Sequence, residues 1–134
     1  MHIYLAARYS RFSEMQQYAA QLTDLGYTVT SRWILGDHDI RAHGQSEAPH
    51  YMPLWAEEDF ADLVAADTVI SFTEAPGETS GRARGGRHVE FGMALALRKR
   101  CLIVGPREHV FHWLPTVDSY TTWDAVLAAL GQEA

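Results

Sequence analysis

Apolar residues gather in four short runs along the chain, and segments with helical periodicity separate them. The runs cover residues 3–7, 27–33, 68–73 and 101–105. The first, third and fourth runs are continuous rather than alternating, which is typical of strands in a parallel sheet covered on both faces. The sequence therefore predicts four buried strands, and it indicates a short fifth strand near residues 110–113 or 119–120.

Helical patterns lie between and after these runs. Ser13 is predicted to cap the first helix and Gly26 to end it, whereas Pro53 is predicted to open the second. The inward faces of these two helices are expected to consist of Met15, Tyr18, Ala19 and Leu22, and of Leu54, Trp55, Phe60, Leu63 and Val64. A third helix follows Gly86, and a fourth spans about residues 122–130.

This alternation of strands and helices predicts a doubly wound α/β fold. We expect a single domain over residues 1–134, with a flavodoxin- or Rossmann-like parallel sheet of four to five strands and helices on both faces. Two polar segments, residues 36–52 and 74–84, interrupt the pattern, and loops of such length in a small domain are often functional. Both are expected at the carboxyl ends of the strands, where open α/β sheets bind ligands.

The net charge, the cysteine content and the apolar runs exclude several kinds of partner and site. The net charge is −6, so a nucleic-acid polymer is not expected as a partner, because no basic surplus neutralises its phosphates. Cys101 is the only cysteine and lies in an apolar run, which indicates a buried thiol rather than a disulfide or a metal cluster. We find no secretory leader and no apolar run of membrane-spanning length, and we therefore expect a cytoplasmic protein without a membrane partner.

Glycines at positions 85, 86 and 92 surround a segment that leads directly into a helix-forming run. This arrangement is typical of a loop that opens a helix. Glu90 is therefore predicted in the first helical turn, where free N–H groups and the helix dipole favour a negative charge. Its side chain is then expected to be ionised at neutral pH, as a carboxylate nucleophile must be. The alternative is that Glu90 only complements the helix dipole.

Further stretches of the chain favour the catalytic interpretation of Glu90. In order, the motifs are Ile3-Tyr4-Leu5, Glu58-Asp59-Phe60, Ala66-Asp67-Thr68-Val69-Ile70 and Glu90-Phe91-Gly92-Met93-Ala94. In this order and spacing, the chain resembles the nucleoside 2-deoxyribosyltransferase family, including relatives that hydrolyse 2′-deoxynucleoside 5′-monophosphates. The basic residues 98–100 and the strand after them match the family's usual continuation, and the resemblance extends over residues 3–105.

The resemblance implies a catalytic set of three residues. Glu90 would attack C1′ and form a covalent glycosyl-enzyme, since a carboxylate stabilises and then traps an oxocarbenium-like state. Asp59 would contact or protonate the leaving base, at about 5 Å from Glu90 as in retaining glycosidases. Tyr4 would orient Glu90 through its hydroxyl. Without the resemblance, Asp59 also fits a solvated helix carboxylate and Tyr4 a half-buried strand aromatic, and Asp67 is expected to be structural.

One departure from the family pattern concerns the substrate. Transferases of free nucleosides commonly have an acidic residue six positions before the nucleophile, where this chain has Arg84. An arginine cluster beside a glycine loop and a helix N-terminus is suited to bind an anion. The residues assigned to substrate binding are Arg8, Ser10, Arg11, Arg84, Gly85, Gly86 and Arg87. We therefore expect a 5′-phosphorylated substrate, with a solvated basic loop as the alternative.

The histidine-rich loop does not match a metal-ligand motif. His38, Asp39, His43 and His50 are expected to belong to a polar lid over the base, and no metal and no cofactor is expected. Family members complete their active sites with residues of a neighbouring subunit, often from the region that corresponds to residues 106–115 here. The resemblance therefore implies a homodimer or a larger homo-oligomer, with a small nucleoside or nucleotide as substrate.

Two other functions are compatible with the sequence. A related Rossmann-like domain can sense a nucleotide without turning it over, and Glu90 would then make a structural salt bridge away from any pocket. Hydrolysis of an NAD-type dinucleotide also uses a glutamate at a comparable position, and it needs a groove long enough for two nucleotides. The sequence leaves three properties open: the nucleobase, the choice between water and a second base as acceptor, and the size of the oligomer.

Overall fold

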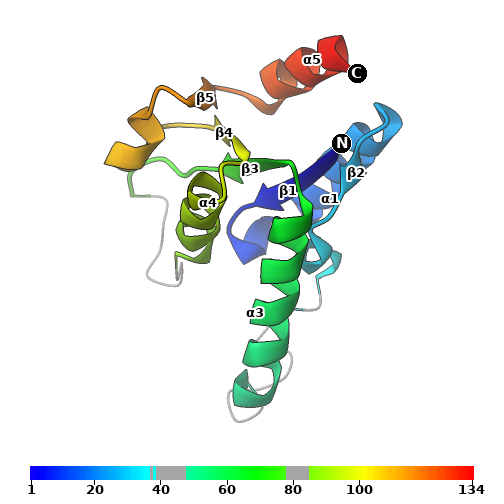
Figure 1. Ribbon diagram of the computed structural model, residues 1–134, viewed down its shortest axis with the longest axis vertical. Coiled ribbons are helices and arrows are strands. Elements are labelled where there is room, and N and C mark those ends of the chain that lie inside the picture. Colours follow the sequence, from blue (N-terminus) through cyan, green and yellow to red (C-terminus); the bar gives the residue numbers. More distant parts are fainter. Residues whose placement is uncertain (37, 39–47, 78–84) are drawn as a thin grey trace.

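Five parallel strands form one sheet in the computed structural model, which describes residues 1–36, 38, 48–77 and 85–134 (Figure 1). The strands are β1 (His2–Ala6), β2 (Thr28–Val29), β3 (Thr68–Phe72), β4 (Arg100–Val104) and β5 (Val117–Tyr120). Their order in the sheet is β2-β1-β3-β4-β5, and every neighbouring pair is parallel. This confirms the predicted doubly wound sheet in its flavodoxin-like order, in which the strand order reverses between β1 and β3.

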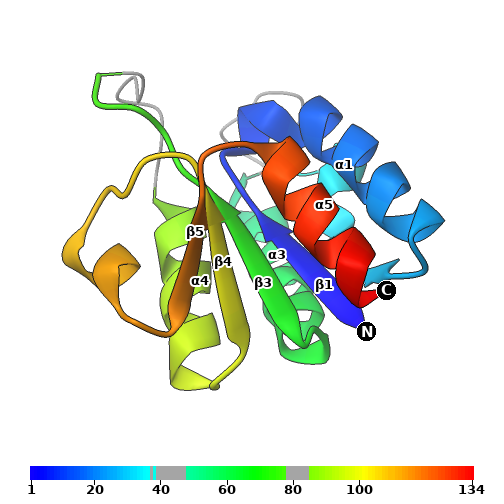
Figure 2. The ribbon, with the colours of Figure 1, turned by 90° about the horizontal axis from the view of Figure 1, so that it is seen from above.

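Helices cover both faces of the sheet (Figure 2). In the described residues, α1 (Phe12–Asp24) and α5 (Trp123–Glu133) lie on one face, whereas α3 (Ala48–Ala65) and α4 (Gly86–Ala96) lie on the other. Tyr18 of α1 stacks on Trp123 of α5 with ring centroids 4.4 Å apart. On the other face, α3 and α4 contact each other and β1. None of the helices in these residues combines the length and the apolarity that a membrane span requires.

The second predicted strand is only partly a strand. The pattern predicts it over residues 27–33, whereas β2 has two residues and is followed by a 3₁₀-helix, η2 (Arg32–Leu35). The turn buries Trp33, whose indole N–H donates a hydrogen bond to the Leu5 carbonyl at 2.8 Å. A buried indole needs such a partner, so this contact favours the turn over a longer strand. The fifth strand lies at the later of its two indicated places, and a 3₁₀-helix, η3 (Val110–Trp113), occupies the earlier one.

The helix starts also differ from those predicted. α1 begins before Ser13, and Arg11 at its N-cap makes no side-chain capping hydrogen bond. Arg11 instead donates two hydrogen bonds to the Glu14 carboxylate, at 2.9 and 2.7 Å, in the first turn. Pro53 does not open α3 but lies inside it. The end of α1 is as predicted, because Gly26 follows the helix with a φ of +96°, a conformation that favours glycine.

The apolar face predicted for α3 is largely wrong. Leu63 is fully buried, but three other predicted inward residues are 61%, 53% and 45% exposed, namely Leu54, Phe60 and Val64. The cause is the buried Asp62, which accepts hydrogen bonds from the backbone N–H and the guanidinium of Arg32. The carboxylate therefore takes an inward position next to η2, and α3 presents an apolar surface to solvent.

Two single-residue predictions about the sheet are confirmed. Cys101 is 1% exposed, and burial raises the pKa of its thiol to about 11, so the thiol is unreactive at neutral pH. Asp67 accepts a hydrogen bond from the backbone N–H of His2 at 2.9 Å. The contact joins the residue before β3 to the start of β1, which is a structural role.

Candidate active site

Glu90 and Tyr4 meet where α4 crosses β1. Tyr4 is fully buried in the middle of β1, and its hydroxyl donates a hydrogen bond to Oε2 of Glu90. The two residues are 86 positions apart in the sequence, and the parallel sheet brings them together. The contact that the resemblance implies for Tyr4 is thus present. Because burial and the neighbouring carboxylates raise the pKa of Tyr4, its hydroxyl stays protonated and acts as a donor.

The electrostatic environment of Glu90 differs from the prediction. Gly85 is the N-cap of α4, so Glu90 lies beyond the first turn, and that turn contains no acidic residue. Burial raises the pKa of Glu90 to about 8, the charge of Asp59 raises it as well, and the hydrogen bond from Tyr4 opposes both effects. The prediction that the helix dipole keeps Glu90 ionised at neutral pH is therefore wrong, because burial is the dominant effect here. In the unliganded protein, most Glu90 side chains hold a proton at pH 7.

A cleft of about 240 Å³ opens beside Glu90, between α3 and α4. Its lining consists of Ala56, Asp59, Phe60 and Leu63 from α3 and of Gly86, Val89, Glu90 and Met93 from α4. The two ionisable groups in this lining are carboxyls, one from each helix. An apolar cleft with a few converging polar groups is typical of a small-molecule site, and the volume lies just below the usual range of about 300–1,000 Å³.

A second, larger hollow of about 390 Å³ lies between α1, β2 and η2. It includes none of the residues predicted for the site, and Arg32 is the one charged residue in its lining. Size alone does not mark an active site, so we place the candidate site in the cleft with the two carboxyls, which also lies beside the reversal of strand order between β1 and β3.

Two of the arginines predicted to bind an anion are already paired with carboxylates. Arg87 is 5% exposed and contacts both carboxylate oxygens of Glu108, one of them at 2.8 Å. Arg11 is bound by Glu14 and also donates to Glu74 at 3.2 Å. The assignment of Arg87 to substrate is therefore corrected: its guanidinium joins α4 to the connection between β4 and β5.

The other residues predicted to bind the anion lie in two places, after β1 and at the start of α4. Ser10 is exposed within a 3₁₀-helix, η1 (Tyr9–Arg11), and Arg8 lies just before it at the carboxyl end of β1. Gly85 caps α4 and Gly86 lines the cleft. Arg84 lies outside the described residues, as do Asp39 and His43 of the predicted lid.

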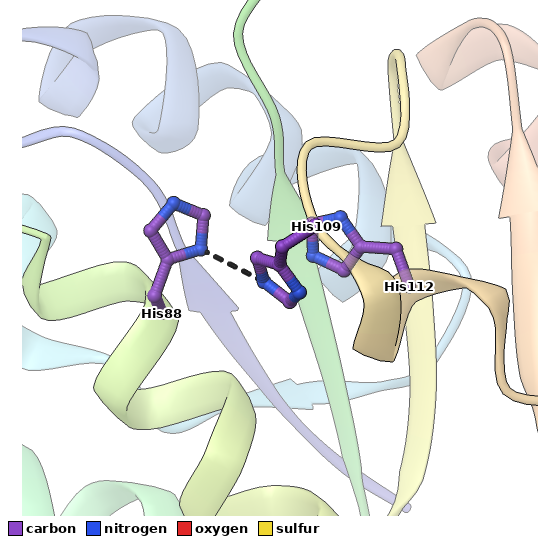
Figure 3. Close-up of side chains that lie close together, drawn as sticks. All are labelled: His88, His109 and His112. Carbon is purple, nitrogen blue, oxygen red and sulfur yellow. Dashed lines mark hydrogen bonds between the residues drawn. The ribbon is translucent and has the colours of Figure 1, made fainter.

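Three histidines cluster between α4 and η3, namely His88, His109 and His112 (Figure 3). His88 Nδ1 lies 3.2 Å from His109 Nε2, and the rings of His109 and His112 have centroids 3.7 Å apart and planes tilted by 32°. The backbone N–H of Glu108 donates to Nδ1 of His112, so the proton of this neutral ring is on Nε2. The one lone pair of the neutral His112 ring accepts this hydrogen bond, so His112 has none free for a metal. This arrangement therefore does not fit one metal ion held by all three rings.

This cluster was not predicted from the sequence, because His88 lies 21 positions before His109. The spacing of His109 and His112, three positions apart on one helical turn, was an available signal. The cluster packs η3 against α4. Burial lowers the pKa of His112 to about 4 and also lowers that of His88, so both rings are neutral at pH 7.

The contact between His38 and Asp59 was also missed. His38 lies in the predicted lid, with Nδ1 at 3.7 Å from Oδ1 of Asp59 and Nε2 at 3.4 Å from Oε1 of Glu58. Its ring stacks on Trp55 of α3, with centroids 5.1 Å apart. His38 thus lies beside one of the two carboxyls of the cleft.

Fold and site together define an α/β protein of flavodoxin-like strand order with a half-buried glutamate, bound by a tyrosine, in a cleft. The fold is shared with a solved 2-deoxyribosyltransferase from the psychrotolerant bacterium Bacillus psychrosaccharolyticus, at a TM-score of 0.67 and 18% identity over 95% of this chain and 90% of that chain. It is also shared with the CMP N-glycosidase BcmB of Clostridium botulinum, at a TM-score of 0.62 and 18% identity over 98% of this chain and 99% of that chain. No protein-family model and no curated protein matches the sequence.

Proposed function

We propose that this protein belongs to the nucleoside 2-deoxyribosyltransferase family and cleaves the N-glycosidic bond of a 2′-deoxynucleoside or its 5′-monophosphate, with Glu90 as nucleophile. The observation that carries the proposal is the half-buried Glu90 carboxyl, bound by Tyr4 in a cleft that also contains Asp59. The fold neighbours support it, because one is a 2-deoxyribosyltransferase and the other a CMP N-glycosidase.

In the first step, an oxygen of the Glu90 carboxylate forms a bond to C1′ of the sugar. The C1′–N bond breaks, its electron pair leaves with the base, and Asp59 donates the proton that neutralises that base. Positive charge develops on the sugar ring during this step, and the carboxylate beside it stabilises that charge. The Tyr4 hydroxyl holds Oε2 of Glu90, which leaves Oε1 to attack.

In the second step, a nucleophile attacks C1′ and the ester bond to Glu90 breaks, which restores the carboxylate. Water in this role produces a free sugar or sugar phosphate, and the protein is then a hydrolase. A second base in this role produces a new nucleoside or nucleotide, and the protein is then a transferase. Both outcomes use the same glycosyl-enzyme, so the proposal includes both.

Glu90 must lose its proton before it attacks. Its pKa of about 8 makes the carboxylate the minor form at pH 7, and a carboxyl with a raised pKa is elsewhere often the general acid. The Tyr4 contact favours the nucleophile role, because a hydroxyl that donates to a carboxyl stabilises the charged form.

The preference for a 5′-phosphate is part of the proposal. It depends on Arg8, Ser10 and Arg84 and on the two glycines at the start of α4, since Arg11 and Arg87 are paired with carboxylates. A nucleoside and its 5′-monophosphate should therefore differ mainly in KM. If the Arg84→Ala variant changes KM equally for both, the phosphate argument is wrong.

We also propose that the chain forms a homodimer or a larger homo-oligomer in the cytoplasm. Exposed apolar side chains support this: Leu54, Phe60 and Val64 on α3, Val89 and Leu97 on or beside α4, and Phe111 and Trp113 on η3. Large exposed apolar areas are characteristic of interaction sites. A Val64→Lys variant should shift the mass measured by sedimentation equilibrium toward the monomer, and an unchanged mass argues against this face.

The first test is incubation with each deoxynucleoside and its 5′-monophosphate, with and without an added base, followed by chromatography. Release of base that is lost in a Glu90→Ala variant supports the proposal, and exchange into the added base identifies a transferase. Binding without turnover supports nucleotide sensing instead. That alternative predicts a structural salt bridge for Glu90 away from any pocket, whereas no ion pair of Glu90 occurs among the residues described, and Glu90 lines the cleft.

A further inference from the structure

His38 lies between two carboxylates that are neighbours on α3. Its Nδ1 faces Oδ1 of Asp59 at 3.7 Å, and its Nε2 faces Oε1 of Glu58 at 3.4 Å. The side chain of His38 is 7% exposed, whereas those of Asp59 and Glu58 are 30% and 29% exposed. The imidazole is therefore a nearly buried bridge from a carboxylate of the cleft to one beside it.

The ring of His38 is fixed in its plane by stacking. It lies on Trp55 with centroids 5.1 Å apart and an interplanar angle of 20°, and Tyr51 stacks on the same indole at 5.5 Å. The stack holds the plane of the imidazole, and in this plane Nδ1 faces Asp59 and Nε2 faces Glu58. Distances of this size in an unliganded site commonly shorten when the substrate binds.

We propose that His38 is a proton relay to Asp59, and so a positioning residue for protonation of the leaving base. The inference rests on the proposed function and extends it. A neutral imidazole has a proton on one nitrogen and a lone pair on the other, so it can receive a proton at Nε2 and release one from Nδ1. Two carboxylates at opposite edges of one ring are the arrangement that such a transfer needs.

The proton balance of the cycle is as follows. As the C1′–N bond breaks, Asp59 gives its proton to the base and becomes a carboxylate. Neutral His38, with its proton on Nδ1, then takes a proton at Nε2 from the Glu58 side, which exchanges with solvent, and gives its Nδ1 proton to Asp59. The ring is left with its proton on Nε2, and proton exchange with solvent between turnovers restores the starting tautomer. When water attacks the glycosyl-enzyme, its OH joins C1′ and its proton returns to solvent, so that Glu90 ends as a carboxylate and no net charge accumulates.

The way in which the loss of kcat depends on the leaving group distinguishes a proton relay from a structural role of His38. A nucleobase needs a proton to leave, whereas 4-nitrophenolate leaves as an anion. We therefore compare a deoxynucleotide with the corresponding 4-nitrophenyl 2-deoxyriboside 5′-phosphate as substrates of the wild type and of His38→Gln. We expect kcat for the nucleotide to fall about 100-fold or more, in the range of general acid catalysis, and kcat for the nitrophenyl substrate to stay within about threefold.

A Glu58→Gln variant is the second test, and it keeps the inference falsifiable if His38→Gln does not fold. Glu58 is on the surface of α3 and does not line the cleft, yet its loss removes the outer end of the relay. We expect the same selective loss of kcat for the nucleotide as in His38→Gln, but by a smaller factor of about 5–10. External imidazole should partly restore nucleotide cleavage in a His38→Gly variant.

The outcomes separate the two proposals. Equal losses on both substrates, or no loss on the nucleotide, overturn the relay while the wild-type activity supports the proposed function. If the wild type shows no Glu90-dependent cleavage of either substrate, the proposed function fails and the relay fails with it.

Discussion

Replacing Tyr4 by Phe removes one hydroxyl from the cleft and keeps the aromatic ring in the core. That hydroxyl donates to Glu90 and lowers its pKa, against the larger effect of burial, which raises it to about 8. In Tyr4→Phe the pKa of Glu90 should therefore rise further, because the carboxylate loses a donor that favours the charged form. Since the carboxylate attacks, the variant should lose activity at neutral pH and regain it at higher pH.

The size of this effect follows from the charge on the acceptor. A hydrogen bond to a charged group contributes about 1.5–3 kcal/mol, and one pKa unit corresponds to about 1.4 kcal/mol, so we expect a rise of about one to two units. With a pKa of about 8, roughly a tenth of Glu90 is ionised at pH 7. In Tyr4→Phe this fraction falls about 10–100-fold, and kcat/KM at pH 7 should fall by the same factor.

The assay is kcat/KM for base release between pH 6 and pH 10, because kcat/KM reports the titration of the free enzyme. Asp59→Asn is the matched control with the opposite sign. Removal of its negative charge lowers the pKa of Glu90, so the rise of kcat/KM with pH should begin at a lower pH than in the wild type. The maximum of kcat/KM should be lower, because the proposed general acid is lost. A Tyr4→Phe variant that loses the same factor at every pH, or whose activity rises at lower pH, refutes this reasoning.

Stability and activity should respond to three further changes. The raised pKa of Glu90 means that its contribution to stability is fully present below about pH 4.5 and is lost as the pH rises through about 8. Glu90→Gln should therefore be more stable than the wild type at pH 9, by up to about 5 kcal/mol in urea unfolding, and equal stability at that pH contradicts this. The contribution of His112 to stability depends on pH in the opposite direction. Because its pKa is lowered, the contribution is present above about pH 6.5 and is lost as the pH falls through about 4. His112→Asn keeps an acceptor for the Glu108 N–H and should flatten this acid loss, which is up to about 3 kcal/mol; an unchanged pH slope argues against the assignment. Glu90→Ala should abolish base release and retain substrate binding in calorimetry, and retained turnover rejects the nucleophile.

The fold was predictable because its strongest signals are local. Continuous apolar runs identify β1, β3 and β4, which are buried on both faces, and alternation with helices implies a parallel sheet. The errors occur where a tertiary contact outweighs the local pattern. The indole of Trp33 bonds to Leu5 and ends β2 early, and the pair of Asp62 with Arg32 rotates the polar positions of α3 inward.

The proximity of three candidate site residues was predictable, whereas their electrostatic environment was not, and their catalytic roles stay a prediction. The order of the motifs brings Tyr4, Asp59 and Glu90 together, and all three lie in or beside one cleft. Burial of Glu90 depends on the packing of two helices over a strand, which no spacing in the sequence reports, so its raised pKa was missed. The contact of His38 with Asp59 was missed for a similar reason, because the distance between them depends on the path of a loop.

Mass spectrometry of the acid-quenched protein during turnover tests the central claim most directly. We expect a deoxyribosyl or deoxyribosyl-phosphate adduct on the peptide that contains Glu90. It should accumulate before base release reaches its steady rate, and it should be absent in Glu90→Gln. Base release without an adduct in a matched time course, or an adduct on another residue, would contradict the assignment of Glu90 as the nucleophile.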